Sequence, residues 1–467
     1  MAIDSHIGER MKILVQKFGG TSVDRAEHRT LAARKVLKAR DAGYHPVVVV
    51  SAIGRAGAPY ATDTLINVLR EVDPQVSPAP RELDMIMACG EIISTVIFAH
   101  TLHTMGCQAI ALSGGQAGII TEARFGDARI TELRPQYLLH LLSQGYIPVV
   151  CGFQGITEPE NSHEHGTITT LGRGGSDTTA SALGIALKAE SVEIYTDVNG
   201  VMTADPRIVK DAQTLDTCSY EEVAEIAHQG AKVVHPRAAE LAMDHNMPMW
   251  VKSTFSDARG TRITNKSEDG VPQRRLTGIT HTGRAVFIRL EIGNTPHKAL
   301  IEREVYRMMA RAGISVYFTT FSSRSLSFVV ERSVYPIARD LLDGMVIPVP
   351  HEVPDELGRV STFYIFKYSS GLDLAYSVQR PLLEAVEDRI SVKDVPVSAE
   401  ENCTIVSVIA SEHRMEPGVI SDIYEILTKN GITIYQTTDS ELSISCLISE
   451  SEVDKAVKLL HAHFFPN

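Results

Sequence analysis

Residues 12–23, KILVQKFGGTSV, combine an apolar run of strand length with a lysine, two glycines and two hydroxyl residues. The apolar run predicts a buried strand, and Gly19 and Gly20 let backbone N–H groups approach phosphate oxygens closely. Lys17 would add a point charge. The chain contains neither the Walker spacing G-x-x-x-x-G-K-[ST] nor G-x-G-x-x-G. Taken alone, the stretch is as consistent with plain architecture as with a nucleotide site.

Beyond this stretch, apolar runs of strand length alternate with helical patterns. The run PVVVVS at residues 46–51 is typical of a strand buried on both faces of a parallel sheet. From Asp24 to Gly43 the spacing predicts a helix, with Asp24 as N-cap and Glu27 completing a capping box. Further strands are predicted at residues 108–112, 147–151, 192–196 and 247–251, and further helices at residues 81–104, 135–144, 176–188 and 219–229, the last with a capping box of Ser219 and Glu222. This order predicts an α/β fold with a mainly parallel sheet sandwiched by helices.

Ligands of such sheets bind beyond the carboxyl ends of the strands. Lys17, Ser51, Gly152 and Thr196 all lie at the carboxyl end of a predicted strand. We therefore expect the binding site at this edge of the sheet. The lone tryptophan, Trp250, falls inside a predicted strand and is expected in the core.

The composition is that of a globular chain of 467 residues with a net charge of -12. This charge disfavours non-specific binding to nucleic acid, and it requires an anionic nucleotide to be held by local positive groups. No apolar run reaches membrane-spanning length, and residues 1–10 lack the apolar core of a signal peptide. Six cysteines lie far apart without a C-x-x-C pair, so reduced thiols are expected. We therefore expect a cytoplasmic protein that binds neither nucleic acid nor a membrane.

Two later stretches strengthen the interpretation of residues 12–23 as a nucleotide site. LGRGGSDTTA occupies residues 171–180, and YTDVNGVMTADPR occupies residues 195–207. With KILVQKFGGTSV before them, these motifs resemble the aspartate kinases of the amino-acid kinase family, and the resemblance covers nearly everything from Met11 onward. It implies transfer of the γ-phosphoryl group of ATP to the side-chain carboxylate of aspartate, with Mg²⁺ carried by the nucleotide and no metal site made by the protein alone.

The resemblance also implies roles for individual residues. Lys17 and Asp177 would be catalytic: Lys17 contacts the transferring group, and Asp177 orients Lys17 or the substrate amine. A base is not required, because a carboxylate of pKa about 3.9 is already ionised. Residues expected to bind aspartate are Thr62, Glu91, Arg173, Gly174, Gly175 and Ser176. Residues expected to bind ATP are Lys17, Phe18, Gly19, Gly20, Ser51, Thr196, Asp197, Met202, Thr203, Ala204, Asp205, Pro206, Arg207 and Lys232.

Several of these residues also have a purely structural interpretation. Asp177 suits the first turn of a helix whether or not it is catalytic. Glu91 could be a solvated helix residue, and Arg173 could be a cation on a loop. Residues 205–207, Asp-Pro-Arg, could form only a turn. His-Glu-His at residues 163–165 resembles a metal-binding cluster, but its polar surroundings favour a solvated loop.

The chain repeats itself beyond a polar, irregular stretch at residues 265–273. AGISVY at residues 312–317 is echoed by NGITIY at residues 430–435, and each copy reads strand, helix, Gly, strand, strand, helix. The second copy resembles the ACT domain, a small ligand-binding module that aspartate kinases carry in pairs. The first copy has Thr-Pro-His-Lys at residues 295–298 where the second has Pro-Gly at residues 417–418, so its capacity to bind an effector is open.

Feedback control through this pair is a further implication of the resemblance. We expect a homo-oligomer formed through the ACT domains and inhibited by an amino-acid effector: lysine, threonine or diaminopimelate. The polar run at residues 436–441, expected between two strands, is either an effector site or only a hairpin turn. Residues expected to bind the effector are Pro417, Gly418, Ile432, Thr433, Ser440 and Glu441. The expected domains are an N-terminal extension (1–10), the catalytic domain (11–264), a first ACT-like domain (276–350), an unassigned connection (351–400) and a second ACT domain (401–467).

Two rival functions follow from the same residues. One is a related kinase for glutamate or another small acid, because Arg173 and Glu91 would suit any amino acid. The other is a non-catalytic amino-acid sensor with a vestigial kinase fold. The presence of Lys17, Arg173 and Asp177 argues against the sensor.

Overall fold

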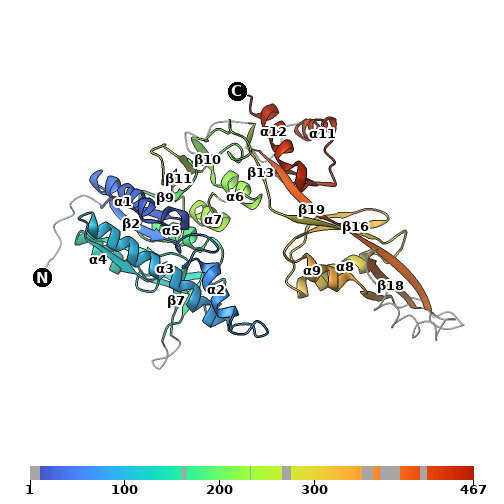
Figure 1. The fold of residues 1–467 in the computed structure, drawn as a ribbon, viewed down its shortest axis with the longest axis horizontal. Helices are drawn as coiled ribbons and strands as arrows, with labels where there is room; N and C mark the ends of the chain where they lie inside the picture. The colour runs from blue at the N-terminus through green and yellow to red at the C-terminus, as the bar shows by residue number, and fades with distance from the viewer. Residues whose placement is uncertain are drawn as a thin grey trace. The chain divides into compact units, whose positions relative to one another are not determined.

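The computed structural model describes residues 11–159, 165–231, 233–265, 275–349, 361–368, 390–410 and 418–466. The chain forms two compact units (Figure 1). The first contains residues 1–278 and 409–413, and the second contains residues 279–408 and 414–467.

An eight-stranded sheet with the order β10-β12-β11-β9-β1-β2-β6-β3 is the centre of the first unit. Every neighbouring pair is parallel except β11 and β12. The predicted mainly parallel sheet is therefore confirmed. Its strands are β1 (Ile13–Phe18), β2 (His45–Val50), β3 (Ala109–Leu112), β6 (Ile147–Cys151), β9 (Ser191–Thr196), β10 (Thr217–Ser219), β11 (Met249–Ser253) and β12 (Thr261–Thr264).

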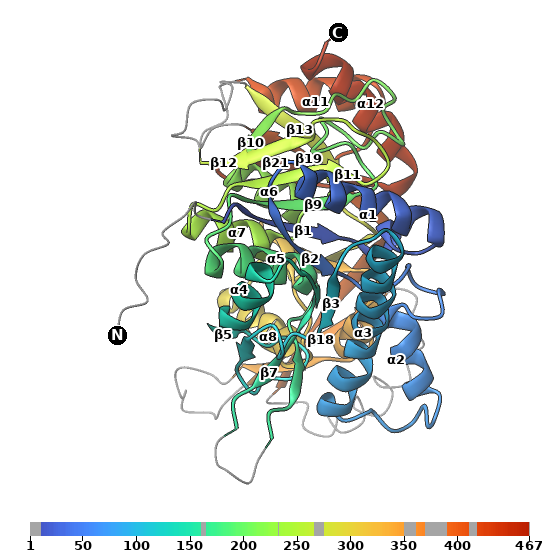
Figure 2. The same cartoon turned by 90° about the vertical axis from the view of Figure 1, so that its left-hand side faces the viewer.

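Helices cover both faces of this sheet (Figure 2). Successive side chains of each strand point to opposite faces, and apolar side chains on both faces pack against helices. On one face, Val15 and Val49 pack with α5 (Gly175–Ala186) and α7 (Pro236–Asp244). On the other, Phe18 packs with α1 (Ala26–Asp41) and α3 (Pro80–Thr104). The remaining elements of the unit are η1 (Gly20–Ser22), α2 (Thr62–Arg70), α4 (Gln136–Ser143), α6 (Tyr220–His228) and a small sheet of β5 (Ile130–Leu133), β4 (Ile119–Thr121), β7 (Gln154–Thr157) and β8 (Ile168–Thr170).

Helix α3 confirms the helix predicted at residues 81–104 and begins one residue earlier, at Pro80. By length and composition it is the one helix among the described residues that would suffice to cross a bilayer. Its contacts are those of a core helix: Phe98 and Leu102 are fully buried against the sheet. The buried Asp84 carboxylate also accepts hydrogen bonds from Thr170 N at 2.8 Å and Gly126 N at 3.0 Å. These bonds attach the first part of α3 to the backbone of Gly126 and Thr170.

The predicted N-terminus of α1 is wrong, whereas that of α6 is confirmed. Helix α1 begins at Ala26, and its N-cap is Arg25 without a side-chain hydrogen bond. Asp24 does not cap the helix; its carboxylate lies 2.7 Å from His28 Nδ1. At α6, Ser219 Oγ accepts from Glu222 N and Glu222 Oε2 accepts from Ser219 N, which completes the predicted capping box.

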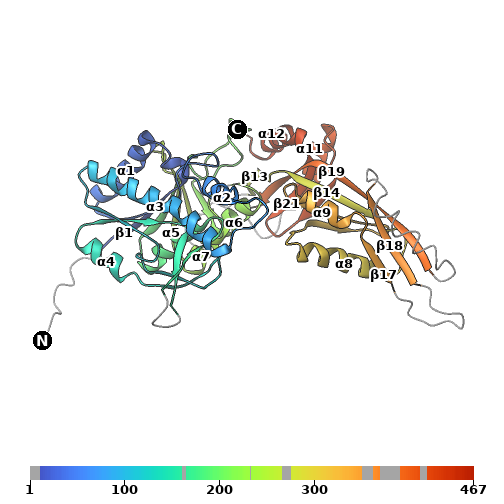
Figure 3. The same ribbon diagram turned by 60° about the horizontal axis from the view of Figure 1, so that its bottom comes forward.

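A nine-stranded sheet forms the second unit, with β15-β16-β14-β19-β18-β17 as its main path. Strands β13 and β21 also pair with β19, and β20 pairs with β21. Helices α8 and α9 lie side by side against this sheet (Figure 3) and bury Val305, Ala338 and Leu342 in its core. The elements are β13 (Leu276–His281), β14 (Ala285–Glu291), α8 (Lys298–Arg311), β15 (Tyr317–Phe321), β16 (Ser325–Glu331), α9 (Tyr335–Leu342), β17 (Val346–Val349), β18 (Ser361–Tyr368), β19 (Ile390–Ala410), α11 (Val419–Lys429), β20 (Gln436–Asp439), β21 (Ser443–Ser449), η2 (Glu450–Glu452) and α12 (Val453–Phe464).

Two regions of this unit differ from the sequence-based interpretation. The unassigned connection contains β18 and the start of β19, which pair in parallel within the sheet. The strand expected directly after Gly431 begins only at Gln436, where ladder pairing with Leu447 starts. The polar run at residues 436–441 is therefore β20 and its following turn, and it does not lie between two strands.

Candidate active site

The end of β1 and the start of α5 bring two charged side chains together. Lys17 Nζ lies 2.6 Å from Asp177 Oδ1, and both side chains are nearly nine-tenths buried. Lys17 projects to the α5 face of the sheet, since its neighbours Gln16 and Phe18 face the other way. The predicted pair is thus in direct contact, and the ammonium is held at the carboxyl edge of the parallel sheet.

The turn before α5 is shaped by glycine. Gly174 is the N-cap, with a left-handed φ of 71°. A Cβ atom at this position would lie 1.9 Å from His235 Cγ, so only glycine lets α7 approach so closely. The backbone N–H of His235 then donates to Asp177 Oδ2 at 3.1 Å. Asp177 is consequently fixed from two sides, by Lys17 and by the start of α7.

The glycine loop after β1 fits against the loop after β2. A Cβ atom at Gly20 would lie 2.4 Å from the carbonyl oxygen of Gly54. Gly54 N donates to Gly20 O at 3.1 Å, and Ser51 N donates to Phe18 O at 3.1 Å. These contacts hold the backbone of the glycine loop against the loop after β2.

Glu91 is a buried acid with an unsatisfied oxygen. It is 3% exposed on α3, which excludes the interpretation as a solvated helix residue. Its Oε1 accepts from Ala52 N at 3.0 Å, and Oε2 has no hydrogen-bond partner among the described residues. Burial raises the pKa of Glu91 to about 8, against the smaller opposing effect of the Ala52 hydrogen bond. A cationic group beside Oε2 would restore the ionised form.

The other residues expected to bind aspartate are placed around the α5 turn and α2. Arg173 is exposed and makes no ion pair with any described residue, so the loop-cation interpretation stays open. Ser176 is buried, and Gly152 leaves it room, since a Cβ there would lie 2.7 Å from Ser176 Oγ. Thr62 opens α2 and is half-buried. Gly174 and Gly175 form the turn itself.

The residues expected to bind the nucleotide separate into two groups. Thr196 ends β9, and the neighbouring Asp197 carboxylate is 3.0 Å from Arg55 Nη2. The second group is residues 202–207, in which Arg207 pairs with Asp205 at 2.6 Å. The Arg207 side chain is 85% exposed, and a turn without a binding role would show the same pairing and exposure. Met202 bridges to Thr214, and Thr203 and Ala204 are buried. Lys232 lies outside the described residues.

One pocket of about 230 Å³ collects part of this predicted set. Lys17, Gly19, Gly174, Asp177 and Thr196 line it. Residues 202–207 do not line it, and neither do Glu91 and Arg173. The pocket therefore unites residues from all three motifs at one end of the predicted site.

His235 and Phe153 are neighbours of the site that the sequence analysis missed. His235 lines the pocket, and burial lowers its pKa, more than the opposing Asp177 carboxylate raises it. Phe153 has a left-handed φ of 70°, rare for a bulky residue, and its N–H donates to Thr179 Oγ1 of α5 at 3.1 Å. The position of His235 just before Pro236, which opens α7, was a local signal for a helix start.

A metal cluster is not visible in the described part of the chain: no three His, Cys, Asp or Glu side chains there are grouped to hold an ion. His165 is exposed, and His163 and Glu164 lie outside the described residues. Magnesium typically retains waters and binds through one or two carboxylates and substrate phosphates.

The residues expected to bind an effector lie around α11 and the β20–β21 hairpin. Gly418 is the N-cap of α11 with φ 103°, and Pro417 lies outside the described residues. Ile432 is buried and Thr433 is exposed. Ser440 caps the hairpin turn: its Oγ accepts from Ser443 N at 3.0 Å. Glu441 follows in the same turn and is exposed.

Family models match both units. A model described as the amino acid kinase family matches residues 12–253, and one described as the ACT domain matches residues 398–462. The chain is 37% identical over 458 residues to aspartokinase 1 of Bacillus subtilis (strain 168), covering 97% of this chain and 99% of that protein. It is 35% identical over 456 residues to an aspartokinase of Mycolicibacterium smegmatis, with coverage of 97% and 96%.

Solved structures with the same architecture include two of Escherichia coli aspartokinase III. One is in complex with aspartate and ADP in the R-state, and it matches with 26% identity and a TM-score of 0.67. The other is in complex with lysine and aspartate in the T-state, with 26% identity and a TM-score of 0.66. Each match covers 97% of this chain and all of the other.

Proposed function

This chain belongs to the aspartokinases of the amino acid kinase family, and from that premise we propose which of its residues carry out the reaction. An aspartokinase transfers the γ-phosphoryl group of ATP to the side-chain carboxylate of L-aspartate, giving 4-phospho-L-aspartate. This is the first step toward lysine, diaminopimelate, threonine and methionine. The observation that carries the assignment is the contact of 2.6 Å between Lys17 and Asp177 inside the glycine-lined pocket.

Lys17 is assigned to the transferring phosphoryl group. The nucleophile is an ionised carboxylate, so the chemical difficulty is repulsion between two anions. A preorganised ammonium that is shielded from water lowers this repulsion and stabilises charge on the transferring group. Asp177 holds the ammonium in place and takes no proton, because the substrate has none to lose.

Glu91 and Arg173 are assigned to the two charged ends of aspartate. The α-ammonium of the substrate would supply the cation that the unpaired Glu91 Oε2 lacks. The guanidinium of Arg173, with no ion pair to a described residue, would bind a carboxylate through two parallel hydrogen bonds. Thr62, Gly174, Gly175 and Ser176 would complete this half of the site.

The nucleotide is assigned to the glycine loop and the end of β9. Gly19, Gly20 and Ser51 would surround phosphate, while Thr196, Asp197, residues 202–207 and Lys232 would form the wall beside the remainder of ATP. Mg²⁺ would come with the nucleotide and neutralise charge on its phosphates. The nearly complete coverage of an aspartokinase that binds aspartate and ADP supports this assignment.

Regulation is assigned to the ACT unit. The ACT match at residues 398–462 and the likeness to an aspartokinase solved with lysine support inhibition by an amino acid. We propose lysine, threonine or diaminopimelate as that effector, a homo-oligomer joined through the ACT domains, and a cytoplasmic location. The domain boundaries expected from the sequence, including a second ACT domain at residues 401–467, remain part of this proposal.

A hydroxamate-trapping assay tests the proposed function. Purified full-length protein is supplied with MgATP and, in separate reactions, aspartate, glutamate or N-acetylglutamate, with lysine, threonine or diaminopimelate added in turn. We expect acyl phosphate with aspartate and inhibition by at least one effector. A preference for glutamate would show that the substrate is glutamate and not aspartate. If no acid gave an acyl phosphate, the protein would be a non-catalytic amino-acid sensor.

A further inference from the structure

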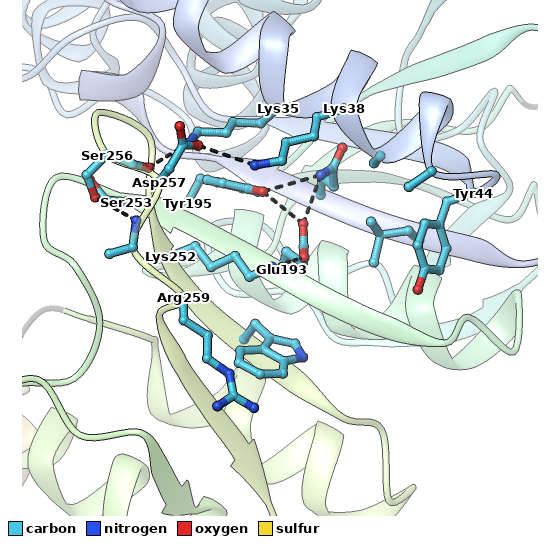
Figure 4. Close-up of a pocket in the computed structure, with 16 residues that line it drawn as sticks. Lys35, Lys38, Tyr44, Glu193, Tyr195, Lys252, Ser253, Ser256, Asp257 and Arg259 are labelled. Atoms are coloured by element: carbon cyan, nitrogen blue, oxygen red, sulfur yellow. Dashed lines mark hydrogen bonds and ion pairs between the residues drawn. The ribbon is translucent and has the colours of Figure 1, made fainter.

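The sheet face opposite Lys17 is only partly covered. Helices α1 and α3 pack over β1 and β2 on this face, but β9 and β11 extend beyond α1. A pocket of about 310 Å³ lies there, between α1, these strands and the loop that follows β11 at residues 254–259 (Figure 4). Trp250, expected in the core, is only half-buried and lines this pocket.

Polar side chains on three neighbouring strands form the floor of this pocket. Glu193 accepts a hydrogen bond from Gln16 Nε2 at 2.8 Å and one from Tyr195 OH at 2.9 Å, and it pairs with Lys252. Since a carboxylate only accepts, the amide nitrogen of Gln16 must face it. Gln16 is 1% exposed, and its Oε1 is left without a partner among the described residues. The floor therefore has a spare hydrogen-bond acceptor.

The walls are cationic. Lys35, Lys38, Lys252 and Arg259 line the pocket, against the carboxylates of Glu193 and Asp257 alone. Lys35 and Lys38 converge on Asp257, as Figure 4 shows, at 2.8 and 3.6 Å. Among the described residues Arg259 has no carboxylate partner and rests over the Trp250 ring at 5.8 Å. This excess of positive charge stands out on a chain with a net charge of -12.

We propose that this pocket binds a small anion that also carries a hydrogen-bond donor, either a phosphate or a hydroxylated carboxylate. Lys38 and Arg259 contact the anionic group, and the donor pairs with Gln16 Oε1. The site is separate from the active site, since Gln16 and Lys17 point to opposite faces of β1. Tyr195 lines both pockets, so a ligand here would contact the strand that ends at Thr196.

Isothermal titration on the full chain, with ADP and aspartate saturating the active site, tests the proposal. Two matched pairs of probes separate charge from the donor: hydrogen phosphate against sulfate, and malate against succinate. We expect phosphate or malate to bind saturably. In each pair the probe without the hydroxyl, sulfate or succinate, should bind about tenfold more weakly. The pair with the tighter binding shows which type of ligand the pocket prefers.

Variants locate the site. Lys38→Ala with Arg259→Ala should weaken binding at least about tenfold while kcat stays unchanged. Arg129→Ala, an exposed cation beside β5, serves as the control and should bind like wild type. The proposal fails if neither anion binds saturably, if the double variant binds as wild type does, or if sulfate and succinate bind as tightly as their partners. If the double variant does not fold, the measurement is repeated on Lys38→Ala and on Arg259→Ala separately.

Discussion

The active-site pocket and the β20–β21 hairpin were both predicted as ligand sites. Their side chains differ in burial and in the contacts they make. In the pocket, Lys17 and Asp177 are buried and contact each other, and outside the pocket the buried Glu91 keeps an unpaired oxygen. In the hairpin, Ser440 uses its hydroxyl on its own turn, and Glu441 and Thr433 face solvent. The buried pair suits the phosphoryl transfer proposed for a single chain. The exposed hairpin would need a second surface to enclose an effector.

The largest expected effect is at the preorganised pair. Lys17→Met should lower kcat by about 100- to 1000-fold, because loss of one preorganised charge contact costs about 3 to 4 kcal/mol of barrier. Steady-state kinetics with saturating aspartate and ATP measure the change, and circular dichroism checks the fold.

Lys12→Met is the matched control, since Lys12 is exposed just before the same strand. It should retain wild-type kcat. A near-normal kcat in Lys17→Met would show that this lysine has no part in the mechanism. The pocket and the hairpin would then no longer differ in having a preorganised charged group.

The next effect concerns the unpaired acid. Glu91→Gln should raise KM for aspartate about 10- to 100-fold with a smaller change in kcat, because a neutral amide replaces a charged partner of the substrate ammonium. Glu82→Gln, an exposed position on the same helix, is the control. An unchanged KM for aspartate would show that Glu91 is structural only.

Glu91 also predicts a pH dependence. With its pKa raised to about 8, kcat/KM for aspartate should rise as pH approaches 8, since the ionised acid binds the ammonium. Stability runs the other way: the folded state holds a proton that the unfolded state releases near pH 4.5, so the free energy of unfolding falls between pH 4.5 and about 8. Denaturant unfolding of Glu91→Gln across this range should lack that decline.

Arg173→Lys should have a more modest effect on the same substrate. A lysine keeps the charge but loses the bidentate fork, so KM for aspartate should rise about tenfold while KM for ATP stays constant. Initial rates with each substrate varied in turn measure both constants. A rise in KM for ATP alone would move the α5 turn from the aspartate half of the site to the nucleotide half.

The sequence predicted local features of the site better than its long-range contacts. Strand and helix patterns placed Lys17 and Asp177 at element ends, and three motifs in order identified the family. The contact of His235 N with Asp177 joins residues 58 positions apart and has no local pattern. The open face at Glu193 and Trp250 was missed because apolar strands were assumed to be covered on both sides. Polar residues at alternating positions of β9 and β11 were the available signal.

The smallest effect separates effector binding from turn formation at the hairpin. Ser440→Ala removes an acceptor for Ser443 N and should lower the free energy of unfolding by about 1 kcal/mol, so relief of inhibition in this variant could reflect a loosened turn. Glu441→Ala is the sharper change, because an exposed side chain should alter stability by less than about 0.5 kcal/mol. If Glu441 contacts the effector, its variant should require more effector for half-inhibition at unchanged uninhibited kcat. Equal inhibition of wild type and Glu441→Ala, measured with lysine, threonine and diaminopimelate, would leave the hairpin as structure alone and place control elsewhere in the ACT unit.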